Sequence, residues 1–453
     1  MKKLFNGRFM LLLIAAFMLA FVVACSSDDD DSDNGSDDSN GSSDEASNGE
    51  DGEISGELEI QYFVGGYGDS WWKEVIADFQ AEYPDVTVIE QAGPNINDEM
   101  RSRWVANDPP DLVYIDGAGS SETQMAEDGQ LMNLTEWVEG IELEGGDKLV
   151  DSFIVQPGKF DGEILSLPLV FDTWGTWYDK ALFDENGYEV PTDFESLMSS
   201  MEEIKADMGI DPYVTSGQHP YYFLRGALYP AFGAAGGDEL LADLITGAEG
   251  AWTQDVVLDT MKKVERMQQE GMFDSGLGAL NHTQSQMNFL LHDNAFIPVG
   301  FWLPNEMAND TPEDFDYGFI PSPMQDPGEN YAIVPDLRPL AIAENASNPD
   351  AAKAFIEFAF TREYAKSFSE HTGAIMNVDG VDLSENENVP GYLIEANAMI
   401  NDPDQVSIYE KPHPMSSDLE GPIGDALMSL MLGNMTAEEF VEAAEKAAAD
   451  YRN

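Results

Sequence analysis

Carboxylates are the most abundant groups in this chain that could do chemistry, yet no catalytic spacing organises them. The 86 acidic residues would readily supply the two carboxylates, about 5 to 10 Å apart, that hydrolysis of a glycosidic bond requires. No pair stands in a recognisable catalytic motif, the five histidines form no metal-ligand motif, and no Gly-x-Ser-x-Gly nucleophile elbow is present. We therefore expect no catalytic site, no metal and no other cofactor. A glycosidase remains as the weaker alternative to a function without catalysis.

The single cysteine, Cys25, follows a segment typical of an export signal. Lys2, Lys3 and Arg8 precede an apolar run over residues 9–24. That run is shorter than the roughly 20 residues of a membrane-spanning helix, which disfavours an uncleaved anchor. Residues 22–25 resemble the lipobox of bacterial lipoproteins, in which the cysteine is acylated and becomes the new N-terminus. We expect a signal peptide at 1–24 and a lipid on Cys25 that holds the protein on the extracytoplasmic side of the cell membrane.

The next segment, residues 25–56, predicts a flexible tether. It consists almost wholly of Ser, Asp, Asn, Gly and Glu, so it cannot bury enough apolar surface to fold. A flexible chain of this length reaches about 30 Å, and repulsion between its acidic groups extends it further. A cation-binding tail is the alternative, but the alternating ligands and turn glycine of a calcium loop are missing.

The charge of the chain excludes one class of partner. There are 21 basic residues against the 86 acidic ones, a formal net charge of −65. Nucleic-acid binding depends on Lys and Arg contacts to phosphate, so we expect no nucleic-acid partner. So acidic a surface repels itself unless salt screens it, which suggests a salt-loving host. The remainder of the chain is long enough for two domains, and its 43% hydrophobic content is ordinary for a globular protein.

The body of the chain alternates strands and helices. Residues 57–64 predict a strand that becomes buried, a glycine turn follows at 65–68, and a helix capped by Asp69 or Ser70 ends at Pro84. The pattern continues with a strand at 86–89, a helix at 96–106, a strand at 112–115 and a helix near 122–128. This rhythm predicts a parallel sheet covered by helices on both faces.

Three later helices carry capping signals. Thr192 and Glu195 are spaced as a capping box, and so are Thr436 and Glu439. Asn348 is placed to cap a helix that has proline in its first turn.

Several spaced motifs together resemble the extracellular solute-binding proteins of carbohydrate ABC importers, the family related to maltose-binding protein. The most specific is a Leu-Pro at 167–168, then Tyr-Asp-Lys-Ala-Leu-Phe at 178–183, then Gly187 and Pro-Thr at 191–192. The Pro-Asp strand at 110–115, the strand and tryptophan turn at 295–302 and the Thr-Gly at 372–373 fit in the same order. The motifs at 63–68, 177–178, 301–306 and 319–323 are most similar to binders of N-acetylglucosamine and chitin disaccharide.

This resemblance implies an α/β fold of the two-lobed periplasmic-binding-protein type (type II), with a ligand cleft that closes by hinge motion. Lobe 1 would comprise residues 57–168 plus 331–372, and lobe 2 residues 169–330 plus 373–453. A monomeric receptor would capture a sugar, with N-acetylglucosamine or a chitin oligosaccharide as the expected class, and deliver it to separate ABC permease subunits. The alternatives are another solute, such as a peptide or a polyamine, and a secreted glycosidase.

A sugar site needs flat aromatic surfaces and a few placed polar groups, and the resemblance implies where they lie. The loop of Gly65, Gly66 and Tyr67 would follow the first strand, where the glycines let the backbone approach a ligand; a plain turn is the alternative. Trp174 would stack on the sugar and Asp172 would accept its hydroxyls. Trp177 and Tyr178 would instead pack in lobe 2.

Five further residues are candidates with an open alternative each. Trp302 could stack on the sugar or belong to the core, and Asp116 could accept hydroxyls or cap the following helix. Gln218 and His219 could meet a hydroxyl, although a lone histidine is more often structural. Arg338 could bind a ligand oxygen or pair with Asp336.

Overall fold

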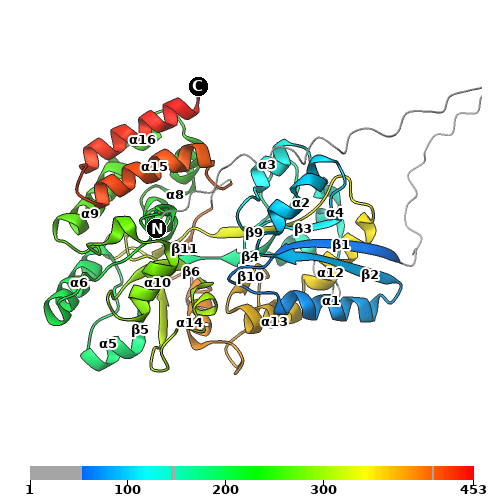
Figure 1. Ribbon diagram of the computed structural model, residues 1–453, viewed down its shortest axis with the longest axis horizontal. Coiled ribbons are helices and arrows are strands. Elements are labelled where there is room, and N and C mark those ends of the chain that lie inside the picture. Colours follow the sequence, from blue (N-terminus) through cyan, green and yellow to red (C-terminus); the bar gives the residue numbers. More distant parts are fainter. Residues whose placement is uncertain (1–53, 144–145, 147, 411–412) are drawn as a thin grey trace, which may run out of the picture. The chain divides into compact units, whose positions relative to one another are not determined.

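The computed structural model describes residues 54–143, 146, 148–410 and 413–453 (Figure 1). The predicted signal peptide, Cys25 and the tether up to residue 53 lie outside the described residues.

The largest sheet has six strands and mixes parallel with antiparallel pairing. In spatial order they are β10 (Ile375–Met376), β4 (Leu167–Asp172), β9 (Asp336–Ile342), β3 (Leu112–Tyr114), β1 (Gly56–Phe63) and β2 (Val86–Gly93). β1 pairs in parallel with β2 and β3, as predicted. β9 runs antiparallel to β3 and β4, and β10 runs antiparallel to β4. The predicted parallel sheet is therefore right for three strands and wrong for the rest, which join from remote parts of the chain.

Helices cover both faces of this sheet because its strands alternate their side chains. Leu112 and Tyr114 of β3 join the cluster that holds the apolar residues of α1 (Ser70–Glu82) and α12 (Pro349–Ala359). Val113, between them, belongs to a separate cluster packed by side chains of α2 (Ile96–Val105) and α3 (Glu122–Glu127). Figure 1 shows α1 and α12 on one side of the sheet and α2 and α3 on the other.

The chain passes from this sheet into a second, antiparallel one of three strands. β4 is separated by one residue, Thr173, from β5 (Trp174–Asp179), which lies between β6 (Ile297–Gly300) and β7 (Tyr317–Ile320). β8 (Tyr331–Ile333) pairs in parallel with β11 (Val406–Ile408), and the chain then re-enters the six-stranded sheet as β9. Trp177 and Tyr178 of β5 are buried, as predicted.

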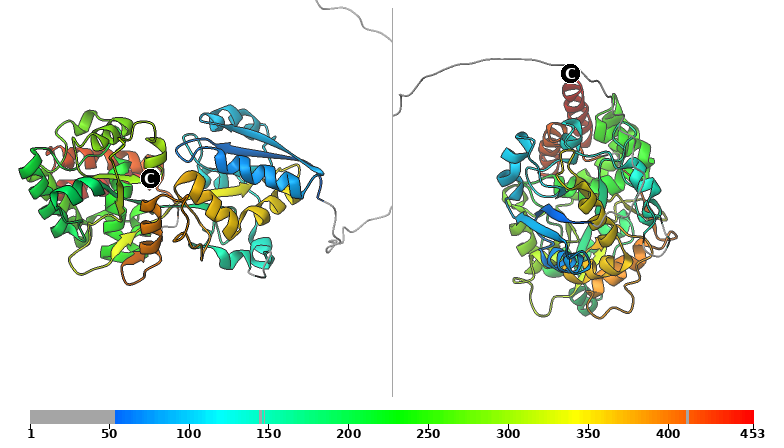
Figure 2. Two further views of the ribbon diagram at one scale, coloured as in Figure 1. Left: turned by 90° about the horizontal axis from the view of Figure 1, so that it is seen from below. Right: turned by 90° about the vertical axis from the view of Figure 1, so that its right-hand side faces the viewer.

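The remaining helices all follow β5 in the chain except α4, which precedes β4. They are α4 (Thr135–Gly140), α5 (Lys180–Asn186), α6 (Phe194–Met208), α7 (Tyr221–Phe223), α8 (Tyr229–Thr246), α9 (Asp255–Gln269), α10 (His282–Leu290), α11 (Leu303–Glu306), α13 (Arg362–Thr372), α14 (Gly391–Ile400), α15 (Ser417–Met431) and α16 (Ala437–Tyr451). Short 3-10 turns lie at Leu149–Ser152, Ala251–Thr253 and Leu277–Ala279, and a π-helical turn lies at Leu224–Leu228. Figure 2 shows the C-terminal helices α15 and α16, in red, against green helices, and rings of Trp252 and Phe440 meet there at 6.2 Å.

Of the caps predicted for the three later helices, two are confirmed. Thr436 and Glu439 form a reciprocal capping box at α16. The Asn348 side chain accepts a hydrogen bond from the Ala351 amide at the start of α12. Asp69 does occupy the N-cap position of α1, although its side chain makes no capping bond there.

The predicted box of Thr192 and Glu195 is wrong by one residue. The N-cap of α6 is Asp193, whose carboxylate accepts the Ser196 amide at 2.9 Å, while the Ser196 hydroxyl accepts the Asp193 amide at 3.0 Å. The cap needs an extended residue whose side-chain oxygen reaches the third amide of the helix, and Asp193 fits at φ −162° and ψ 177°.

We predict that Asp193→Ala lowers the free energy of unfolding by about 1 kcal/mol, because the first turn of α6 loses its acceptor. Thr192→Ala is the matched control, since that exposed side chain caps nothing, and should cost less than about 0.5 kcal/mol. Urea denaturation of both variants measures the two costs. An equal loss in both would contradict the observed cap.

Candidate functional site

The loop after β1 depends on glycine at two positions. A Cβ on Gly65 would lie 2.2 Å from the Phe63 ring, and a Cβ on Gly66 would lie 2.8 Å from Cβ of Trp302. The carbonyl of Gly66 also accepts a hydrogen bond from the amide side chain of Asn305. The loop from the first sheet therefore touches the Trp302 segment directly, and a side chain on Gly66 would disturb this contact.

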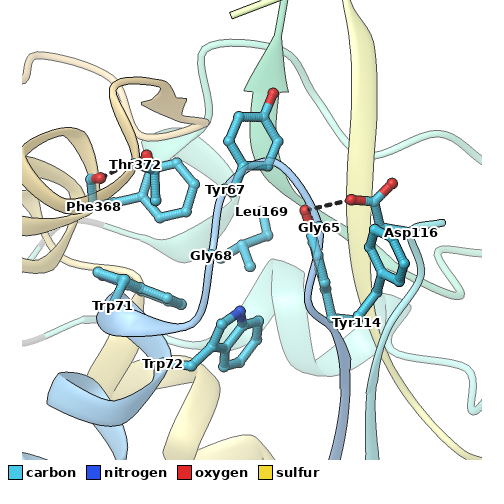
Figure 3. Close-up of a pocket in the computed structure, with 11 residues that line it drawn as sticks. Gly65, Tyr67, Gly68, Trp71, Trp72, Tyr114, Asp116, Leu169, Phe368 and Thr372 are labelled. Atoms are coloured by element: carbon cyan, nitrogen blue, oxygen red, sulfur yellow. Dashed lines mark hydrogen bonds between the residues drawn. The ribbon is translucent and has the colours of Figure 1, made fainter. Parts of the chain in front are cut away.

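A small pocket lies beneath this loop (Figure 3). Its floor and walls come from α1, α13 and the ends of β1, β3 and β4, and its lining residues are Phe63, Gly65, Tyr67, Gly68, Trp71, Trp72, Tyr114, Asp116, Leu169, Phe368 and Thr372. Figure 3 shows Tyr67 between Phe368 and Thr372 on one side and Tyr114 and Asp116 on the other. The pocket thus offers an aromatic wall next to a carboxylate.

Arg338 joins three carboxylates beside this loop. Its Nε lies 3.2 Å from Oδ1 of Asp116, which follows β3. Its two terminal nitrogens lie 3.1 Å from Oδ2 of Asp172 and 2.9 Å from Oδ2 of Asp336. Asp172 and Asp336 are directly opposite each other where β4 pairs with β9. Pairing of two segments remote in sequence therefore brings the three carboxylates to one guanidinium, and the pairing with Asp336 that the sequence left open is present.

A second arginine extends this network. Arg225 contacts Oδ2 of Asp336 at 3.3 Å and both carboxylate oxygens of Glu420 at 2.9 to 3.0 Å. Its guanidinium also stacks on the ring of Tyr221 at 4.9 Å. Arg225 lies in the π-helical turn, and such turns frequently mark functional positions. Arg225 and Glu420 were not predicted from the sequence, and the scarcity of basic residues was the one signal that pointed to Arg225.

Asp116 does not cap the helix that follows it. The N-cap of α3 is Ser121, whose hydroxyl accepts the Gln124 amide. Asp116 instead accepts the Gly117 amide at 2.8 Å and the Tyr114 hydroxyl at 3.4 Å. Its carboxylate therefore belongs to the Arg338 network and the pocket.

Burial dominates the electrostatics of the network. It raises the pKa of Asp172, which is fully buried, to about 7, against the opposing effect of Arg338. It also raises the pKa of Asp116, again opposed by Arg338. Burial alone would lower the pKa of Arg338, but the neighbouring carboxylates raise it, so that the arginine stays charged. The Tyr67 hydroxyl lies near Asp172, and burial together with this carboxylate raises its pKa well above the usual value.

Several buried polar atoms on the β4–β5 connection have no well-formed hydrogen bond within the described part of the chain. They are Oδ1 of Asp172, the Thr173 hydroxyl and Nε1 of Trp174. The Tyr67 hydroxyl also lacks a well-formed bond, although it is close enough to Asp172 to lower the pKa of that carboxyl. Buried polar groups without a partner cost free energy, so such a group commonly bonds water or a ligand. The three consecutive residues are 0%, 0% and 3% exposed.

Aromatic rings surround Trp174. Its ring lies edge-on to Trp302 at 4.6 Å, to Tyr222 at 5.2 Å and to Tyr221 at 6.4 Å. Trp174 is buried at the centre, whereas Trp302 and Tyr221 are partly exposed. Trp302 and Tyr221 therefore have the ring surface that a ligand could cover.

Gln218 and His219 lie at the margin of this aromatic cluster. The exposed Gln218 donates a side-chain N–H to the carbonyl of Ala279, which uses one of its two amide donors. The ring of His219 lies 5.8 Å from Tyr221 and 5.7 Å from His282. Burial and the nearby His282 lower the pKa of His219.

The predicted site residues thus form two connected groups, and Gln218 and His219 lie at the edge of the second group. Asp116, Asp172, Arg338 and Tyr67 share one electrostatic network, and Trp174 and Trp302 form one ring cluster that Gly66 also contacts. Among the described residues, no group of three or more His, Cys, Asp or Glu side chains could hold a metal ion. Within the same part of the chain, no helix is long and apolar enough to cross a membrane.

Comparison with known proteins gives consistent matches. The model of the family described as bacterial extracellular solute-binding protein matches residues 65–366. The diacetylchitobiose binding protein NgcE of Streptomyces coelicolor is 27% identical over 324 residues, covering 69% of this chain and 68% of that protein. The diacetylchitobiose binding protein DasA of the same organism is 22% identical, covering 82% and 86%.

A solved structure titled chitin oligosaccharide binding protein superposes with a TM-score of 0.66 at 19% identity, covering 87% of this chain and 98% of that chain. At this identity the likeness concerns the fold alone. It confirms the predicted class, an α/β two-lobed fold of the periplasmic-binding-protein type.

We predict that Asp172 makes stability fall as the pH rises. The folded protein holds this proton up to about pH 7, whereas the unfolded chain releases it near pH 4, so ionisation favours unfolding between these values. Relative to Asp172→Asn, the wild type should lose at most about 1.4 kcal/mol of unfolding free energy per pH unit in this window, and nothing above it.

Urea denaturation from about pH 5 to pH 8 measures this difference. Asp310→Asn, at an exposed position, is the control and should follow the wild type at every pH. If the unfolding free energies of the wild type and Asp172→Asn change in parallel with pH, Asp172 is already ionised at the acid end of this pH range and the prediction is wrong.

Proposed function

Because this chain belongs to the bacterial extracellular solute-binding proteins, we propose that it captures a sugar and delivers it to the permease of an ABC importer. One observation carries the sugar assignment: partly exposed rings at Trp302 and Tyr221 adjoin Trp174, whose buried Nε1 has no hydrogen-bond partner among the described residues, and Trp174 lies two positions after the buried Asp172. A sugar presents both an apolar C–H face and hydroxyls, so it matches rings beside unsatisfied donors and acceptors.

Each polar group has a distinct role in this proposal. Oδ1 of Asp172 accepts a ligand hydrogen, and Nε1 of Trp174 donates one. Gly66 leaves room for the Trp302 side chain, which forms part of the ring surface. Gln218 and His219 sit at the edge of the site and contact outer parts of a longer ligand.

The relatives narrow the class of sugar. Two of them are named as diacetylchitobiose binding proteins, which supports N-acetylglucosamine or a chitin oligosaccharide as the ligand class. A peptide, a polyamine and turnover by a glycosidase are the alternatives that the experiments must exclude.

We further propose two lobes, residues 57–168 plus 331–372 and residues 169–330 plus 373–453, that close around the ligand by hinge motion. Support comes from the connections: β4 leads into β5 through Thr173, and the chain returns through β9. The Arg338 network lies on these two strands, so a ligand that contacts Asp172 contacts the hinge.

The N-terminal segment supports a location of the protein at the membrane surface. We propose that Cys25 carries the lipid, that the tether at residues 25–56 lets a monomeric receptor move beside the permease, and that the acidic surface suits a salty medium. A single acyl chain binds membranes weakly, so a diacyl modification is expected.

We predict that Trp302→Ala weakens sugar binding about tenfold or more, because it removes ring surface from the site. Trp174→Phe should weaken it as well, since the indole N–H is lost while the packing is largely kept. Trp137→Ala is the control: that half-buried tryptophan of α4 bonds Glu357 and adjoins no proposed site residue.

Calorimetry in high salt against chitin disaccharide, other sugars, peptides and spermidine measures these affinities. Chromatography of the same sugar after incubation tests for turnover. Retained affinity in both site variants would reject the ring assignment, and cleavage of the sugar would reject a binding-only role.

We predict that Cys25→Ser moves the protein from the membrane fraction to the medium, because no thiol remains to be acylated. Ser26→Ala is the matched control and should stay in the membrane fraction. Membrane retention of the Cys25 variant would reject the lipid anchor.

A further inference from the structure

A carboxylate lies on the same short helix as the Trp302 ring. Trp302 is the N-cap residue of α11, and its carbonyl accepts the backbone N–H of Glu306 at 2.8 Å. Residues four apart in a helical turn lie on one face, so the Glu306 side chain is a neighbour of the Trp302 side chain. The Glu306 side chain is 30% exposed, so its carboxylate is accessible to a ligand.

A buried glutamine fixes this carboxylate in place. Gln286 of α10 is 0% exposed, and its Nε2 donates a hydrogen bond to Oε2 of Glu306 at 2.9 Å. Its Oε1 is buried without a hydrogen bond among the described residues. A buried amide is costly to the fold, and this one spends its bond on orienting Glu306. A carboxylate accepts about four hydrogen bonds, so Glu306 keeps acceptor capacity for a ligand.

A histidine stands opposite the other oxygen of Glu306. Nε2 of His282 lies 3.7 Å from Oε1 of Glu306, which is too long for a hydrogen bond. The His282 ring lies 5.7 Å from the ring of His219, at the edge of the site. A hydroxyl both donates and accepts, so one sugar hydroxyl can bridge Glu306 and His282.

The rings of the site connect this carboxylate with Trp174. The Tyr222 ring lies 6.3 Å from the His282 ring at an angle of 18°, and it lies edge-on to Trp174 at 5.2 Å and to Trp302 at 6.3 Å. Burial raises the pKa of Tyr222, and the neighbouring Tyr221 and Glu306 raise it further. The ring cluster therefore has polar groups in two places, at Trp174 and at Glu306.

We propose that Glu306 and His282 form a second sugar subsite, in which the Glu306 carboxylate accepts hydrogen bonds from a second sugar unit. The preferred ligand is then an oligosaccharide of at least two units rather than a monosaccharide. This proposal rests on the proposed function, because the first unit is the sugar held at Trp302 and Trp174. Gln286 is a positioning residue that acts through Glu306.

The test is calorimetry in high salt with a disaccharide and its monosaccharide. The probes are chitin disaccharide with N-acetylglucosamine, and maltose with glucose as a second pair; the ratio is measured with the pair that binds. We expect the wild type to bind the disaccharide at least about tenfold more tightly than the monosaccharide, because a bond to a charged acceptor is added.

Glu306→Gln should weaken disaccharide binding about tenfold and monosaccharide binding less than about twofold, since a hydrogen bond to a neutral acceptor is weaker than one to a carboxylate. Glu306→Asp, which withdraws the carboxylate, is a second variant that should lower the same ratio. Glu313→Gln, at an exposed position, is the matched control and should keep the wild-type ratio.

Gln286→Met tests the positioning role. It should lower the disaccharide preference, and its loss should not add to that of Glu306→Gln in the double variant, because both act on one contact. Additive losses, or equal losses for both sugars, would reject this role of Gln286.

Equal affinity of the wild type for the two sugars overturns the second subsite and leaves the sugar-binding function standing. So does a loss in the Glu306 variants that is no larger for the disaccharide than for the monosaccharide. The absence of binding by every sugar tested overturns the proposed function, and the second subsite with it.

Discussion

The contact of Arg338 with three carboxylates is the interaction on which the rest of the site depends. It joins the end of β3 to the paired ends of β4 and β9, so three segments remote in sequence meet at one guanidinium. A buried ion pair costs about as much in desolvation as it returns in attraction, but removing one partner leaves an uncompensated charge and costs about 3 to 5 kcal/mol. The network therefore specifies the arrangement of these strands more than it adds stability.

The Arg338 network lies on the strands that link the six-stranded sheet to the rest of the chain. β4 and β9 are the strands through which the chain leaves and re-enters the six-stranded sheet, and Arg225 ties the same carboxylate, Asp336, to Glu420 of α15. A ligand that adds a bond to Asp172 changes the balance at this junction. In the proposed function, binding and lobe closure are coupled, because Asp172, the residue proposed to meet the ligand, ends β4, which is part of the proposed hinge.

Much of the fold was predictable because it follows local rules. The helical spacing of apolar residues and the capping residues predicted α1, α12 and α16. Each of these helices begins or ends at a residue that the sequence marks. The failures have non-local causes. The antiparallel strands β9 and β10 join the sheet from far along the chain, so the regular alternation near the N-terminus could not reveal them. At α6 two adjacent residues could both cap, and backbone geometry rather than spacing selected Asp193.

The site residues likewise divide into those that the sequence indicated and those that only the fold brings together. Family resemblance pointed to Asp172, Trp174 and Arg338, but Arg225 and Glu420 lie 195 positions apart and meet only through the fold. The most direct measurement of the central claim is a crystal structure of the protein with a bound sugar. The account predicts a sugar ring against Trp302 with one of its polar groups at hydrogen-bond distance from Asp172. A sugar bound away from β4 and β9, with no contact to the Arg338 network, would contradict it.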